Sequence, residues 1–189
     1  CRRDVEHVII PSNIKRIEKS SISYCSKLQS ITFEPNSTVD TLCDEAFSQN
    51  DLLKNIIIPP SVKFVGEKVF AYNKNLESIE FLGDNLSMKM NSFDFLHDLF
   101  SQEKREVLIS FPNATNLEFE YGYLNGDFAK VVIIKVNHDA KLTGRALPDI
   151  QNRIKYFGDE DEDDKKDTEI QEKVKNPKLK EEEKKLQNL

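Results

Sequence analysis

The side chains best suited to chemistry in this chain are three histidines, three cysteines and a run of acids. His7, His97 and His138 are far apart in sequence, and no zinc-ligand spacing, nucleophile motif or glycine-rich phosphate loop accompanies them. Surface or packing roles are therefore favoured for the histidines. A polar cluster around His97, His138 and Asp139 is the arrangement that an enzyme would need, but no site motif supports it. We predict a protein that is not an enzyme and uses no metal or cofactor.

Three cysteines are too few for a disulfide scaffold. We interpret Cys25 and Cys43 as small, buried apolar side chains. Cys25 could pair with a histidine as a nucleophile, but it shares one repeat position with Asn50 and Asn73. A compact side chain at that position can satisfy backbone groups between stacked turns, so a structural role is favoured.

The acid run Asp159–Asp164 suggests a calcium loop, and alternate residues fit the first three ligand positions of an EF-hand. The sixth position is Asp164 rather than Gly, and the twelfth is Ile170 rather than Glu, so we reject this interpretation. Residues 159–189 hold 12 acidic and 8 basic residues and few aliphatic ones. We predict a disordered, solvated tail, with a partner-binding helix formed on docking as the alternative.

The charge balance argues against nucleic acid as a partner. The net charge is −6, and because the tail contributes −4 of it (8 − 12), residues 1–158 carry only −2 and no clustered basic patch. The longest aliphatic runs, such as Val131–Ile134, are far shorter than the roughly 20 residues of a transmembrane helix. No signal peptide is visible at the start, but the chain lacks an initiator Met. Cys1 precedes Val5 much as Cys25 precedes Leu28, so we expect a fragment that begins inside a repeat.

Apolar residues recur at a shared spacing in the first half of the chain. Val8, Ile31, Ile56 and Ile79 are 23, 25 and 23 residues apart. The same 25- and 23-residue steps separate four further sets of positions: Ile14, Val39 and Val62; Ile17, Leu42 and Val65; Ile22, Phe47 and Phe70; and Leu28, Leu53 and Leu76. A unit this small cannot bury its own apolar side, so the repetition predicts a solenoid whose stacked copies share one core.

Each unit is predicted to begin with a short strand. Alternate side chains of a strand point to opposite faces, so Val8 and Ile10 face the core while Ile9 faces outward. Pro11 then ends the strand, because proline lacks the N–H that a ladder needs.

The segment Leu53–Phe70 is the clearest copy of this repeat, and it resembles the BspA-like leucine-rich-repeat family, whose consensus is roughly L-x-x-I-x-I-P-x-S-V-x-x-I-G-x-x-A-F. Residues 5–81 follow the pattern, although its glycine occurs only at Gly66. The resemblance implies a solenoid used for binding. It also implies a surface protein of bacteria or parasitic protists, with adhesion as the commonest role.

The repeat continues in a degraded form. Ile109–Thr115 echoes Ile31–Thr38, and further strands are expected at Val131–Ile134 and at Ile154–Phe157. A short helix is expected over Phe93–Lys104, with an apolar face made of Phe95, Leu96, Leu99 and Phe100. About seven strand positions result, near residues 8, 31, 56, 79, 109, 131 and 154.

The predicted fold class is an α/β-type leucine-rich-repeat solenoid made mainly of short β-strands. One continuous solenoid is expected over 1–158, regular over 1–81 and degenerate over 82–158, and the charged tail follows over 159–189. Three N-x-[ST] sequons, at Asn36, Asn85 and Asn113, slightly favour a secreted context.

These features predict a non-enzymatic binding protein for a protein or glycan ligand, a surface adhesin-like protein by family resemblance. Its expected binding surface is the outward strand face, formed by Ile9, Thr32, Ile57 and Glu80. The alternative explanation for these positions involves no binding role: β-branched residues favour strands in general. The alternative function is an intracellular scaffold that uses the charged tail as a second contact. The location follows the function: cell surface or secreted in the first case, cytoplasm in the second.

Overall fold

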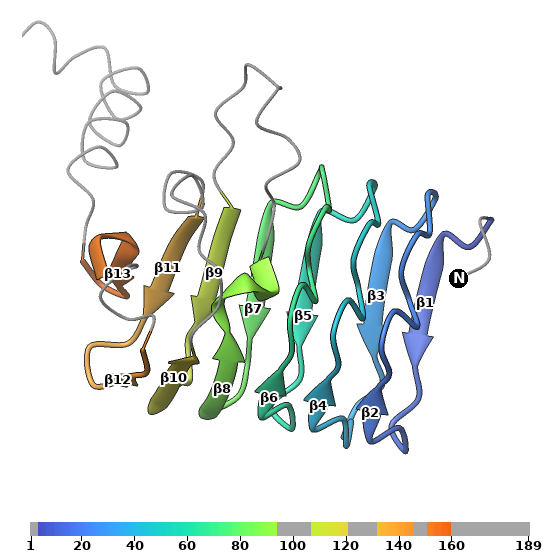
Figure 1. Ribbon diagram of the computed structural model, residues 1–189. Coiled ribbons are helices and arrows are strands. Elements are labelled where there is room, and N and C mark those ends of the chain that lie inside the picture. The colour runs from blue at the N-terminus through green and yellow to red at the C-terminus, as the bar shows by residue number, and fades with distance from the viewer. Residues whose placement is uncertain (1–3, 94–106, 121–131, 146–150, 160–189) are drawn as a thin grey trace, which may run out of the picture. The chain divides into compact units, whose positions relative to one another are not determined.

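The structure, a computed structural model, describes residues 4–93, 107–120, 132–145 and 151–159 (Figure 1). Contacts divide the chain into two units, Cys1–Phe157 and Gly158–Leu189. Of the tail predicted over 159–189, only Asp159 is described, and the rest lies outside the described residues. The helix expected over Phe93–Lys104 also lies outside them, apart from Phe93.

The first unit carries a layer of short parallel strands, one strand to each coil of the solenoid. A two-stranded sheet is formed by β1 (His7–Ile10) and β3 (Ser30–Phe33), and a five-stranded sheet by β5 (Asn55–Ile58), β7 (Ser78–Phe81), β9 (Val107–Phe111), β11 (Val132–Val136) and β13 (Ile154–Tyr156). Strands β3 and β5 lie side by side, so the two sheets form one layer, here named the first layer (Figure 1). Its strands confirm the predicted repeat, although Ile134 rather than Val131 pairs with Ile109.

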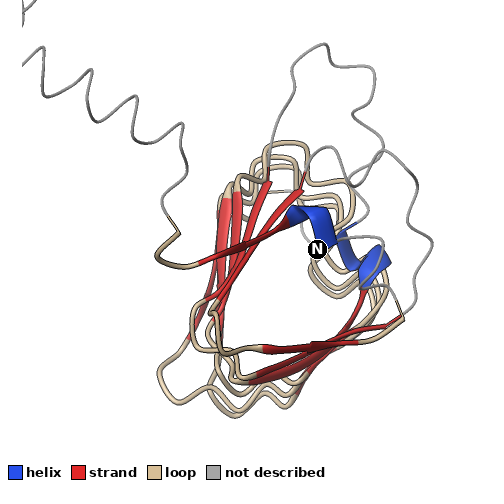
Figure 2. Cartoon of the chain, turned by 90° about the vertical axis from the view of Figure 1, so that its left-hand side faces the viewer, coloured by secondary structure: helices blue, strands red, loops and turns tan. Residues whose placement is uncertain are grey.

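A second strand in each coil builds an opposite layer, which the spacing of apolar residues does not predict. This second layer is a six-stranded parallel sheet of β2 (Arg16–Ile17), β4 (Thr41–Leu42), β6 (Phe64–Val65), β8 (Asn85–Lys89), β10 (Asn116–Glu120) and β12 (Lys141–Thr143). Seen along the stacking direction, the two layers and the loops between them enclose the interior (Figure 2). Two short 3-10 helices, η1 (Met90–Phe93) and η4 (Gln151–Arg153), complete the described elements.

A column of phenylalanine rings fills the interior between the layers. Neighbouring ring centroids lie 5.1 to 6.5 Å apart along the series Phe33, Phe47, Phe70, Phe81, Phe111 and Phe119. Phe47 and Phe70, predicted as core residues, have no exposed side-chain area. Because the pairs Phe47–Phe70, Phe70–Phe81 and Phe81–Phe111 join rings of successive coils, the column links these coils into one core, which the hydrophobic effect stabilises.

Two buried asparagines satisfy the backbone at the turns that lead back to the first layer. The Asn50 side chain accepts a hydrogen bond from the Cys25 N–H (3.0 Å) and donates to the carbonyls of Ile22 and Phe47 (2.8 and 2.9 Å). Asn73 repeats this one coil later, accepting from the Asn50 N–H at 2.7 Å. The predicted role of this position is confirmed for the two asparagines, whose side chains link the backbones of successive turns.

Left-handed backbone positions recur in successive coils without glycine. Ser20, Glu45 and Lys68 have φ between 52° and 58°, and they occupy equivalent positions in three coils. A second set, Tyr24, Gln49 and Tyr72, has φ between 56° and 60°. The left-handed conformation of a non-glycine residue lowers the free energy of unfolding by roughly 1–2 kcal/mol, so the surrounding packing and hydrogen bonds must hold these tight turns.

Candidate functional site

The outward side of the first layer carries the row of residues that the sequence predicts as a binding surface. This outward row consists of Ile9, Thr32, Ile57 and Glu80. Strand pairing sets Ile9 opposite Thr32 and Ile57 opposite Glu80, so the row crosses four coils at one register position. The two isoleucines are 66% and 55% exposed.

Beyond Glu80 the same register position is polar and then basic. Ser110 pairs with Glu80, Lys135 pairs with Ser110, and Lys155 pairs with Lys135. The exposed isoleucines are therefore confined to one end of the row, and the charges lie towards the other end. A ligand that lies along the row meets an apolar end and a charged end.

A second row of outward side chains runs beside the first and is held together by hydrogen bonds. His7 Nδ1 lies 2.8 Å from the Ser30 hydroxyl, and the Ser78 hydroxyl donates to Asn55 Oδ1 at 2.8 Å. Leu108, which pairs with Ser78, continues this row as an exposed apolar residue. The sequence pattern predicts His7 just before a strand, whereas it is the first residue of β1.

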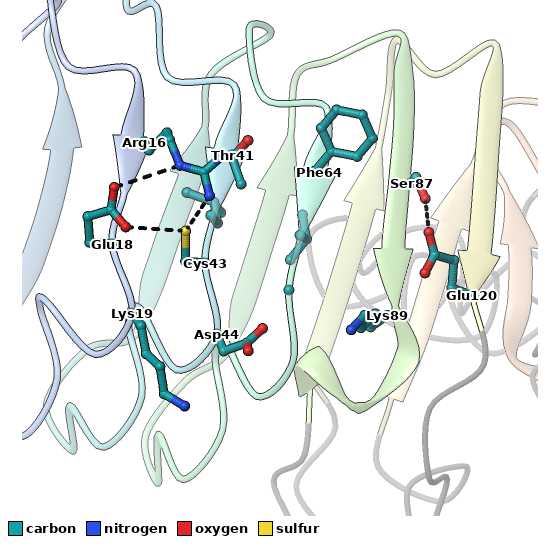
Figure 3. A pocket seen from close by; sticks show the side chains of 13 residues that line it. Arg16, Glu18, Lys19, Thr41, Cys43, Asp44, Phe64, Ser87, Lys89 and Glu120 are labelled. Atoms are coloured by element: carbon teal, nitrogen blue, oxygen red, sulfur yellow. Dashed lines mark hydrogen bonds and ion pairs between the residues drawn. The ribbon is translucent and has the colours of Figure 1, made fainter.

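The second layer carries a shallow hollow on its outward side, with a volume of about 340 Å³ (Figure 3). Gly66 is one of its lining residues, and a Cβ there would lie 2.5 Å from Asp44 Oδ1 and 2.9 Å from the Asp44 nitrogen, so the two coils approach too closely at this point for a side chain. The Phe64 ring stands beside the hollow and is 55% exposed. Thr41 and Ser87 flank Phe64 on the neighbouring strands, because both pair with it in the sheet.

Charged side chains around the hollow are mostly paired with one another. Lys89 Nζ lies 3.0 Å from Glu67 Oε1, and this hydrogen bond raises the pKa of Lys89 above its ordinary value, with further support from nearby carboxylates. Arg16 lies 3.7 Å from Glu18 and donates to the Cys43 sulfur at 3.2 Å (Figure 3). The hollow therefore presents an exposed aromatic ring among balanced charges, without an excess of either sign.

The cysteines correct the interpretation that both are buried apolar groups. Cys25 is fully buried, but it is disulfide-bonded, so it is neither a simple apolar filler nor a candidate nucleophile. Cys43 is a free thiol that is only half-buried. It faces outward because its position follows the short strand β4, two residues beyond the outward Thr41, and the charged groups of Arg16 and Glu18 keep it at the surface.

The polar cluster considered around His97, His138 and Asp139 is described only in part. The His138 ring stacks on Tyr156 with centroids 4.8 Å apart, and Asp139 is exposed. His97 lies outside the described residues. Within the described ranges, no group of three or more His, Cys, Asp or Glu side chains could hold a metal ion. The same ranges contain no helix that is long and apolar enough to span a membrane.

The row on the first layer is foreseeable because its signal is a strand with two-residue alternation. The hollow was missed, because its strands are two residues long at β4 and β6 and give no such alternation. One feature of the sequence could have predicted the hollow. Phe64 lies between the core residues Val62 and Val65, so an aromatic residue occupies a position of the repeat that faces solvent.

Comparison with known proteins gives a family match and a solved structure of low similarity. A solved structure described as the pneumococcal vaccine antigen PcpA is 23% identical to this chain with a TM-score of 0.42, over 75% of this chain. The chain spans only 27% of that structure's length. No curated protein sequence matches. Residues 1–104 match the family described as "BspA type Leucine rich repeat region (6 copies)", which is typically non-enzymatic and implies a role in protein interaction. Because the match covers more than half of its 189 residues, the chain belongs to the BspA-type leucine-rich-repeat family.

Proposed function

We propose that this protein is a non-enzymatic, adhesin-like binding protein of the cell surface or the secreted fraction, and that a protein ligand docks on the outward row. The observation that carries the proposal is the exposure of Ile9 and Ile57 at one register position, whose other members are polar or charged. Neither side chain contributes to the core, so the presence of two isoleucines at the surface favours a role in binding a partner.

The surroundings of the row suit a protein partner. Thr32 and the hydrogen-bonded pairs His7–Ser30 and Asn55–Ser78 offer polar groups beside the isoleucines. Protein interfaces combine a small apolar centre with a polar rim in this way. Parallel strands lie roughly 4.8 Å apart, so the row from the first to the fourth coil spans about 15 Å, enough for a short extended segment or a helix to cross it.

The disulfide of Cys25 supports a location outside the cytosol, because disulfides persist in oxidising compartments. The alternative, an intracellular scaffold that uses the tail as a second contact, depends on residues 160–189, which lie outside the described residues.

The test compares two double variants that carry the same change of charge. Ile9→Lys with Ile57→Lys alters the outward row, and Tyr24→Lys with Phe64→Lys removes two equally exposed apolar residues elsewhere (58% and 55%). Each protein is immobilised, and the proteins retained from extracts of surface and extracellular proteins are compared by mass spectrometry. Circular dichroism confirms that both variants are folded.

We expect a partner to be retained by the wild type and by the Tyr24/Phe64 variant and to be lost from the Ile9/Ile57 variant. Retention by a folded Ile9/Ile57 variant contradicts the proposal. Loss from the Tyr24/Phe64 variant alone contradicts it as well, because the partner then depends on exposed residues outside the outward row.

A further inference from the structure

The three sequons of this chain fall in one corner of the solenoid, where a first-layer strand turns into the following second-layer strand. Asn36 lies between β3 and β4, Asn113 lies between β9 and β10, and Asn85 is the first residue of β8, directly after the turn from β7. Phe33, Phe81 and Phe111, the last residues of β3, β7 and β9, precede them by three, four and two residues. Three motifs far apart in sequence thus occupy the same corner, here named the corner ridge.

Successive turns of the ridge are stacked on one another by hydrogen bonds. The Thr38 hydroxyl donates to the carbonyl of Ser12 at 2.7 Å, and the Thr115 N–H donates to the carbonyl of Asp84 at 2.7 Å. The Asn116 amide donates to Asn85 Oδ1 at 2.6 Å. The turns therefore form an ordered edge between the outward sides of the two layers, rather than separate loops.

All three sequon asparagines are exposed, and their amide nitrogens can accept a substituent without loss of core contacts. Asn36 has φ 60°, a turn conformation that asparagine tolerates well. Asn85 uses only its oxygen in a hydrogen bond, which leaves its nitrogen available. Asn113 Nδ2 donates to the Leu82 carbonyl at 3.1 Å, and this bond can persist because a substituted amide nitrogen keeps one hydrogen.

From this geometry we infer that the corner ridge is N-glycosylated at Asn36, Asn85 and Asn113. A lipid-linked oligosaccharyl diphosphate is the glycosyl donor. A bond forms between the amide nitrogen and the first carbon of the sugar, the bond from that carbon to the diphosphate oxygen breaks, the lipid diphosphate leaves, and the amide loses one proton. The hydroxyl residue two positions later completes the acceptor motif: Thr38, Ser87 and Thr115.

The inference rests on the secreted or surface location given under the proposed function. It adds that glycans and the ligand occupy different surfaces of the protein. Glycans on the corner ridge occupy the edge between the layers, while the outward row of the first layer stays open to a ligand. Asn85 and Asn113 belong to adjacent coils, whose strands β8 and β10 are paired. The two acceptor sites are therefore close together, and substitution at one can hinder the other.

The chain offers a matched control within the same corner. Asn13 is exposed and lies in the corresponding turn between β1 and β2, but Lys15 stands where a hydroxyl residue is required. If the sequon, and not exposure alone, determines which asparagines are glycosylated, Asn13 should remain unmodified.

The decisive experiment maps the asparagines of the protein immunopurified from its source. Treatment with peptide N-glycosidase in heavy-oxygen water converts each glycosylated Asn into a labelled Asp, which peptide mass spectrometry locates. We expect label at Asn36, Asn85 and Asn113, with none at Asn13. Absence of label at any of the three, or label at Asn13, overturns the inference.

A second arm uses secretion from a eukaryotic host and single variants Asn36→Asp, Asn85→Asp and Asn113→Asp. Asp keeps the size and turn tolerance of Asn but lacks the acceptor nitrogen. Each change at an occupied site should remove one glycosidase-sensitive step in gel mobility, and Asn13→Asp should remove none. Unchanged mobility in all three variants contradicts the inference. Occupancy is measured without a ligand, so failure of the binding proposal leaves this result intact, and absent glycans leave the binding test intact.

Discussion

Replacement of Phe70 by Ala tests the packing of the solenoid most directly. The Phe70 side chain is fully buried, and its ring centroid lies 5.9 Å from that of Phe47 and 6.1 Å from that of Phe81. Truncation of a buried Phe costs about 3–5 kcal/mol, from lost transfer free energy and from the cavity left behind. We expect Phe70→Ala to reach the upper part of this range, because two aromatic pairs worth about 0.5–1.5 kcal/mol each are lost together. Phe47→Ala should cost about 3–5 kcal/mol as well.

The assay is urea unfolding followed by far-ultraviolet circular dichroism, with the free energy of unfolding obtained by linear extrapolation. Phe64→Ala is the matched control, because Phe64 lies in the same coil and is 55% exposed. It should change the stability by less than about 0.5 kcal/mol. A loss below about 1 kcal/mol for Phe70→Ala, or equal losses for both variants, refutes the claim that the phenylalanine column holds the coils together.

Further predictions concern the turns, the hollow and the tail. Asn50→Ala should cost about 2–4 kcal/mol in the same urea assay, because it leaves buried backbone groups without partners; a loss near zero contradicts the linking role. Gly66→Ala should lower stability by about 1–3 kcal/mol, since the new methyl group meets a neighbouring backbone, and an unchanged urea midpoint contradicts that contact. Lys89→Met should remove at most about 1 kcal/mol, because the ion pair with Glu67 is exposed. The folded-state pKa of Lys89 is raised, so the contribution of Lys89 to stability is complete below about pH 10 and is lost as the pH rises through that pKa. A stability difference between the wild type and Lys89→Met that occurs only at alkaline pH contradicts this direction. Truncation after Gly158 should leave the melting temperature nearly unchanged, and a drop of many degrees means that the tail packs on the solenoid.

The fold class could be predicted because a repeated sequence shows the same signal several times. The apolar position shared by Leu28, Leu53 and Leu76 is fully buried or nearly so in all three coils. Strand alternation likewise predicts that Ile9 and Ile57 lie on the outward side, where both are exposed. Alternation of apolar and polar residues with a period of two, recurring at a constant spacing, can be recognised directly in an amino-acid sequence.

The second layer could not be predicted in the same way, because its first strands are too short to alternate. The left-handed turn positions are equally invisible. Glu45 and Lys68 adopt a conformation that usually requires glycine, and only the surrounding coils hold them there. Cys25 illustrates a third limit, since a single cysteine in a repeat position looks like its asparagine counterparts until its disulfide partner is brought near.

Parallel stacking also determines how this protein responds to mechanical load. Hydrogen bonds between coils, such as Cys43 N–H to the Ile17 carbonyl and Gly66 N–H to the Leu42 carbonyl, run along the stacking direction. Force along that direction pulls these bonds end-on, and each coil contacts only its neighbours, so rupture proceeds one coil at a time. Force parallel to the strands instead loads a whole ladder at once in shear. A solenoid of this type held by its two ends is therefore expected to lengthen in small steps, one coil at a time.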